Sequence, residues 1–137
     1  MNGTPSRVTH WVTFIRLFLV GTPRFEPRSY LSERRSDFGK APFAPFKDGA
    51  TLSALGRRRL LTAILQHQIA FRLRRHAISQ GQTLKEFASE HPHPVRTLRL
   101  LRGEAAMQVE DIFWAEQVLG ERQISVRFAL GDRPASP

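Results

Sequence analysis

The sequence predicts a mainly α-helical protein, a small helical bundle that follows an irregular N-terminal extension and precedes one short C-terminal strand. Prolines interrupt the chain before residue 50, apolar residues recur at helical spacing from residue 51 onward, and apolar and polar residues alternate after residue 122. A chain of 137 residues provides one domain, or a compact domain of about 80 residues with an appendage. We therefore expect an extension or linker over residues 1–50, a helical domain over 51–121, and a strand with a loose tail over 122–137.

The extension contains an apolar stretch, residues 8–20, whose conformation the sequence leaves open. Its β-branched residues favour a strand, whereas its large apolar residues fall at helical spacing. Arg16 interrupts the stretch, and a helix that crosses a bilayer needs about 20 apolar residues, so we expect no membrane span. A position on a membrane surface stays open as an alternative for this stretch.

Residues 22–49 are predicted to form an irregular linker. Proline, which cannot donate a backbone hydrogen bond, recurs there at Pro23, Pro27, Pro42 and Pro45. Three phenylalanines are candidates to anchor this linker on the following domain: Phe38, Phe43 and Phe46. A flexible extension without such anchors is the alternative interpretation.

Two helices are predicted in the first half of the helical domain. Over residues 53–79 apolar side chains recur every four positions, which indicates a long amphipathic helix, and Gly81 allows a left-handed exit after it. Thr83 and Glu86 then have the spacing of a capping box, which predicts a short helix over residues 84–90. The prolines of residues 91–94 must end that helix.

Two further helices and a strand are predicted after it. Pro94 suits the first turn of a third helix over residues 94–102, which Gly103 ends. A fourth helix is expected over residues 109–119, ending at Gly120. Apolar residues alternate with polar or small ones over residues 124–130, the pattern of a half-buried strand.

The charge of the chain points to a polyanionic partner. The formal net charge is +9, and residues 57–103 carry ten basic and two acidic side chains, a net charge of +8. Such a concentration favours nucleic acid ahead of an anionic membrane. The chain has no cysteine, which excludes disulfides, thiolate zinc sites and cysteine nucleophiles, and fits the reducing cytoplasm.

Neither a catalytic site nor a cofactor site is predicted. No Ser/His/Asp constellation, paired carboxylates or glycine-rich phosphate loop is present, so we expect no enzyme, no cofactor and no small-molecule ligand. His91 and His93 have a spacing that can bind metal together with His67 or His76. Because a metal site needs three or four ligands, ordinary turn histidines are the preferred interpretation, and no metal is expected.

The helix pair of residues 84–102 has the outline of a helix-turn-helix and resembles the Cro/repressor-type DNA-binding domains over about residues 68–120. Phe87-Ala88 in the first helix and Leu98 and Leu101 in the second stand at the offsets of that family when Leu84 is its first position. The closing helix of the family is matched by Arg102-Gly103, Val109, Ile112, Ala115 and Leu119-Gly120. The chain departs from the family where Leu84 replaces Gln and Pro92 replaces Gly, and where His91 and His93 stand at apolar positions. The connection after Leu101 is also one residue shorter, so these departures concern the shape of the turns.

The resemblance, combined with helical geometry, provides candidate DNA contacts. With Leu98 and Leu101 facing the core, Arg96 and Arg99 turn outward and Val95 lies at the exposed start of the helix. An Arg fork matches the O6 and N7 acceptors of guanine, and Val95 suits a thymine methyl, so these three are the candidate base-reading residues. Candidate phosphate contacts, which set register without reading sequence, are Arg74, Arg75, Thr83, Lys85 and Arg102.

The resemblance implies a sequence-specific regulator of transcription, a repressor that occupies an operator in double-stranded DNA, and the small size of the chain fits a phage or mobile-element origin. The alternative is an interaction or architectural protein that binds nucleic acid without sequence preference. We expect a homodimer, because one recognition helix reads few base pairs, with the strand of residues 124–130 and the last helix as its contact.

Overall fold

The computed structural model describes residues 25–120, and this part of the chain is mainly helical. Its α-helices are α2 (Ala54–Ser79), α3 (Leu84–Ser89), α4 (Pro94–Arg102) and α5 (Val109–Leu119). The four predicted helices are confirmed, with ends that differ by at most one residue. The apolar stretch of residues 8–20 and the strand expected over residues 124–130 lie outside the described residues.

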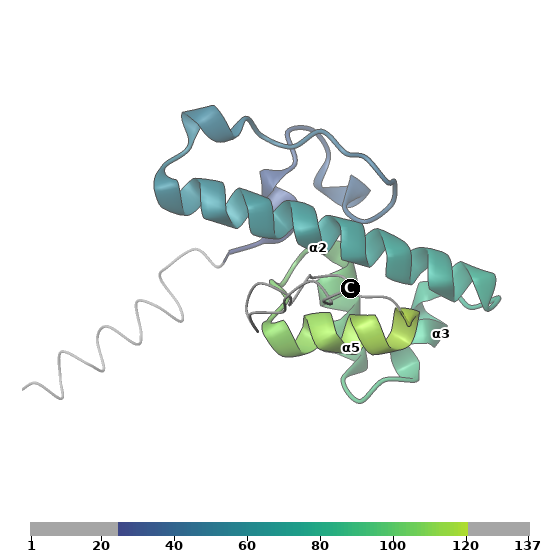
Figure 1. Cartoon of the computed structure of the whole chain (residues 1–137). Helices are drawn as coiled ribbons and strands as arrows, with labels where there is room; N and C mark the ends of the chain where they lie inside the picture. Colours follow the sequence, from purple (N-terminus) through teal and green to yellow (C-terminus); the bar gives the residue numbers. More distant parts are fainter. Residues whose placement is uncertain (1–24, 121–137) are drawn as a thin grey trace, which may run out of the picture.

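Helix α2 is the central element of the fold. It runs across the described part of the chain, with the N-terminal segment along one side and α5 on the other (Figure 1). Ser53 begins it, because its hydroxyl accepts a hydrogen bond from the Gly56 N–H at 3.1 Å. Its buried apolar face packs against α3, α4, α5 and the N-terminal segment, and consists of Leu60, Ala63, Ile69, Ala70, Leu73 and Ala77.

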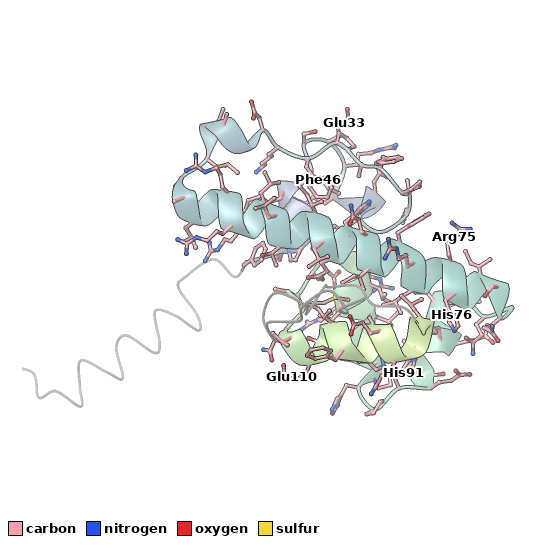
Figure 2. All side chains as sticks on the ribbon, in the orientation of Figure 1. Glu33, Phe46, Arg75, His76, His91 and Glu110 are labelled. Carbon is pink, nitrogen blue, oxygen red and sulfur yellow. The ribbon has the colours of Figure 1, made fainter. Side chains whose placement is uncertain are left out.

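The N-terminal segment, residues 25–51, contributes to the same core. It contains three short 3₁₀ helices, η2 (Pro27–Tyr30), η3 (Arg35–Asp37) and η4 (Gly49–Thr51), and an isolated β-bridge between Leu31 and Phe46. Phe38 is 1% exposed, and Phe46 packs against the core where the segment faces α2 (Figure 2). The predicted anchoring by Phe38 and Phe46 is therefore confirmed. For Phe43 it is wrong, because this side chain is 91% exposed.

Gly103, which follows α4, contacts the N-terminal segment. It ends α4 in the left-handed conformation, with φ of 72°, as its predicted role requires. A Cβ at this position would lie 2.7 Å from the ring of Phe38, and the Gly103 carbonyl accepts a hydrogen bond from the Arg28 N–H at 3.0 Å. Both the backbone conformation and the close approach of Phe38 therefore require glycine here.

Gln66 holds α2 against the connection between α4 and α5. This side chain is 2% exposed, and its amide group donates to the carbonyls of Leu100 and Ala105 at 2.9 and 2.8 Å. Its carbonyl oxygen accepts from the Met107 N–H at 2.7 Å. One buried polar residue thus binds two carbonyls and one N–H between Leu100 and Met107, which holds the end of α4 and the connection to α5 against α2.

Candidate nucleic-acid interface

The pair α3 and α4 forms the predicted helix-turn-helix outline on the surface of α2. Phe87 and Ala88 of α3 are buried, as expected. On α4 the buried residues are Thr97, Leu100 and Leu101, whereas Leu98 is only half-buried. The prediction that Leu98 faces the core with Leu101 is therefore wrong, because α4 packs on α2 through the row that contains Thr97, Leu100 and Leu101.

A capping box begins α3. The Thr83 hydroxyl accepts from the Glu86 N–H, and the Glu86 carboxylate accepts from the Thr83 N–H, both at 3.1 Å. These hydrogen bonds lower the pKa of Glu86. The cap fixes the first turn of α3 and leaves the Thr83 hydroxyl proton available to an acceptor in solvent.

His91 packs the turn between α3 and α4 onto α5. Its ring lies edge to face between Phe87 and Trp114, with centroid distances of 4.7 and 4.8 Å, and its Nδ1 accepts from the Trp114 Nε1–H at 3.3 Å. Burial lowers the pKa of His91, against an opposing contribution from Glu90. A neutral histidine thus fills a place at which the Cro/repressor-type pattern has an apolar residue.

The solvent face of α4 carries three side chains in one row. Val95 is 71% exposed, and Arg99 and Arg102 are exposed at the fourth and seventh positions after it. Residues at this spacing lie on the same face of a helix. The structure therefore brings the predicted base-reading residues Val95 and Arg99 together with the predicted phosphate contact Arg102.

Arg96 does not belong to this row. Its guanidinium forms a bidentate ion pair with the carboxylate of Asp111 on α5, and Nη2 and Oδ2 are 2.8 Å apart. Hydrogen bonding to Asp111 raises the pKa of Arg96. Arg96 is nevertheless 40% exposed and lines a hollow together with Val95 and Arg99, so it lies beside Arg99 as predicted, but its guanidinium is bound to a carboxylate.

Four of the five candidate phosphate contacts surround two adjacent hollows. Arg74, Arg75 and Thr83 line one of about 320 Å³, and Arg74 and Arg102 line the other, of about 350 Å³. The two hollows share Lys40, Arg74 and Leu84. Arg75 and the following residue, His76, leave α2 on different sides of the helix (Figure 2). Lys85 is exposed at the start of α3 and lines neither hollow.

The N-terminal segment adds basic residues to the interface that the sequence analysis missed. Arg28, Arg35 and Lys40 line the 350 Å³ hollow together with Arg74 and Arg102. Residues 22–49 have neither helical nor strand periodicity, so the sequence carries no signal that places these side chains beside α2 and α4. The interface is therefore more basic than the helix pair alone.

Neither a cluster of metal ligands nor a membrane-spanning helix is found within residues 25–120. No three His, Cys, Asp or Glu side chains in this range are grouped so that they could hold a metal ion, and His91 instead binds Trp114. Within the same range, no helix combines the length and the apolar character that crossing a bilayer demands.

Comparison of the chain with protein families, with curated proteins and with solved structures finds no match. What the interface can do chemically follows from its own residues. A basic helix face and two basic hollows lie on a core that buried polar groups hold in place, which suits the binding of a polyanion.

Proposed function

We propose that the chain is a sequence-specific DNA-binding regulator of transcription, which represses by occupying an operator in double-stranded DNA. The observation that carries the proposal is the row formed by Val95, Arg99 and Arg102 on the exposed face of α4, next to the capped start of α3. A helix with such a face enters the major groove in helix-turn-helix proteins. The resemblance to the Cro/repressor-type domains supports the same interpretation.

Base reading is proposed for Arg99 and Val95. Arg99 is exposed, its guanidinium has no carboxylate partner within residues 25–120, and a free Arg fork matches guanine. Val95 offers an apolar contact to a thymine methyl. Arg96 is proposed to position α4 through Asp111, because it would have to give up a charged partner before it contacts a base.

Phosphate binding is proposed for the basic residues around the row and the two hollows. Arg74, Arg75, Thr83 and Arg102 line the hollows, and Lys85 extends the basic surface along α3. Contacts of this kind fix the orientation of the protein on the duplex and add affinity that depends on salt.

We also propose that the protein is a homodimer, that it is located in the cytoplasm and that it is not an enzyme. Two copies read two half-sites about one DNA turn apart, which provides the base pairs that one recognition helix lacks. Val109 and Phe113 stand one turn apart on α5 and are 62% and 46% exposed. This exposed apolar pair supports α5 as part of the dimer contact, whereas the strand expected over residues 124–130 lies outside the described residues.

A second candidate function is architectural binding of nucleic acid without sequence preference. The observation that favours it is the number of basic side chains around the hollows, which suits phosphates and reads no bases. The two candidates differ in whether the face of α4 adds specificity to that affinity.

Selection of bound fragments from a random double-stranded DNA library separates them. The proposal predicts enrichment of one motif, with guanine at a fixed position, from full-length protein at a stated salt concentration. Arg99→Ala is expected to lose preference at that position, while the matched control Arg57→Ala, an exposed arginine near the start of α2, retains the motif. Recovery of fragments without any shared motif would contradict the proposal and favour the architectural candidate.

A further inference from the structure

The 350 Å³ hollow between the N-terminal segment, α2 and α4 is lined by an unusual set of side chains. Five of the lining residues are cationic, Arg28, Arg35, Lys40, Arg74 and Arg102, and Ser36 is also among them. We call this hollow the basic pocket. Its volume is at the low end of the range for small-molecule sites, about 300–1,000 Å³, but most such sites are lined by apolar side chains.

The positive charge of the basic pocket is largely uncompensated. Arg28 is paired with Glu26 at 3.2 Å and with Glu104 at 3.4 Å. None of the side chains that line the pocket is acidic. Within residues 25–120, Arg35, Lys40 and Arg102 have no carboxylate partner, and Asp37, close to Arg35 in sequence, pairs with Arg34 instead.

Backbone contacts hold the centre of the pocket in place. Arg74 Nη2 donates to the Leu101 carbonyl at 3.1 Å. Gly39 packs against the guanidinium, and a Cβ there would lie 3.1 Å from both Arg74 Nε and the Leu101 carbonyl oxygen. Burial lowers the pKa of Arg74, and the positive charge of Arg102 lowers it further. Like charges are thus held near one another by the fold, and an anion placed between them relieves their repulsion.

We infer that the basic pocket binds a phosphate group. Phosphate carries more than one negative charge and several acceptor oxygens, so it can satisfy several cations at once, and the planar Arg fork matches its geometry. The assignment rests on the pocket itself and holds whether or not the chain reads DNA sequence. The phosphate has two possible sources, the backbone of a bound nucleic acid and a free phosphorylated molecule, which share this chemistry.

Titration of the full-length protein with inorganic pyrophosphate tests the assignment. The ionic strength is held constant with sodium chloride, and binding is followed by calorimetry and by the rise in melting temperature. We expect saturable binding to the unmodified chain, and at least tenfold weaker binding to the double variant Arg35→Gln/Lys40→Gln. The matched control Arg57→Gln/Arg58→Gln removes the same charge near the start of α2 and is expected to bind as the unmodified chain does.

Because Arg35 and Lys40 are exposed, the double variant is expected to keep the helical circular-dichroism spectrum. Arg102→Gln provides an independent second variant from α4. Absence of saturable binding to the unmodified chain would overturn the assignment. Equal losses in the pocket variants and in the control would also overturn it, because they would show a nonspecific charge effect.

A second arm, with a labelled DNA duplex, identifies the source of the phosphate. If the DNA backbone supplies it, DNA displaces pyrophosphate, and Arg35→Gln/Lys40→Gln lowers the slope of log K against log salt by about two. If the variant no longer binds pyrophosphate but binds DNA with an unchanged slope of log K against log salt, the pocket binds a free phosphorylated molecule. Either result supports the pocket, whereas a protein that binds pyrophosphate but no DNA would overturn only the function proposed above.

Discussion

Arg96 of α4 and Asp111 of α5 form a bidentate ion pair that connects the candidate recognition helix to the last described helix. Asp111 also accepts a hydrogen bond from the Gln108 N–H at 2.8 Å. The same carboxylate therefore caps the N-terminus of α5 and binds Arg96 of α4. Burial alone would raise the pKa of Asp111, but the hydrogen bonds from Arg96 and Gln108 lower it overall. The pair therefore links α4, whose rotation is set by packing on α2, to the first turn of α5.

A double-mutant cycle measures the coupling free energy between Arg96 and Asp111. Arg96→Ala, Asp111→Ala and the double variant are compared by urea unfolding, with Glu110→Ala as the control for loss of an acidic residue in the first turn of α5. Because the Arg96 side chain is 40% exposed and therefore partly screened by solvent, we expect a coupling free energy of about 1 kcal/mol. A coupling near zero would show that the pair does not hold the two helices together.

Arg99→Ala tests the proposed base contact. If Arg99 reads a guanine, the substitution weakens binding to the preferred site by about 1–3 kcal/mol and changes binding to random DNA little. Fluorescence anisotropy with both duplexes at one salt concentration measures the two losses. Equal losses of binding free energy on both duplexes would show that Arg99 contacts phosphate and does not read a base.

Lys85→Ala tests the proposed phosphate surface on α3. The side chain is exposed at the start of the helix, so we expect weaker binding to all sequences alike and a salt slope lowered by about one. The control Arg57→Ala is expected to keep the slope of the unmodified protein. A Lys85→Ala variant with an unchanged slope would show that Lys85 does not contact the DNA backbone.

The stability of the protein is expected to fall at mildly acidic pH. Burial lowers the pKa of His91 and of His67 below the usual 6.5, so the folded state binds protons less readily than the unfolded state. The stabilisation is therefore complete above about pH 6.5 and is lost as the pH falls through the folded-state values. Urea unfolding between about pH 7.5 and pH 5 measures this decrease.

His91→Phe is the matched variant for this measurement. A phenyl ring keeps the packing against Phe87 and Trp114 but does not titrate, so we expect a smaller decrease, with the remainder due to His67. A variant that loses as much stability as the unmodified protein over the same range would contradict the role given to His91.

The helices were predictable because their signals are local. The capping box of Thr83 and Glu86, the proline at position 94 and the glycines at 103 and 120 act within a few residues of the helix ends that they define. The exposure of Val95 followed from its place at the start of α4, and Arg99 is exposed as predicted although Leu98, which was expected to face the core, is half-buried.

The remaining features depend on contacts between distant parts of the chain. Phe38 is buried because Gly103 lacks a Cβ, and the two residues are far apart in sequence. Packing on α2 sets the rotation of α4, which makes Leu98 half-buried and directs Arg96 to Asp111. The basic pocket was missed for the same reason, since Arg35 and Lys40 come from a segment without periodicity.

The most direct test of the central claim is the ratio of two affinities of the unmodified protein, measured at one stated salt concentration. One duplex carries the motif enriched by selection, and the other has the same composition in scrambled order. A sequence-specific regulator is expected to bind the first about 10³-fold more tightly or better. A ratio near one would contradict sequence reading by α4 and leave a protein that binds nucleic acid through its phosphates alone.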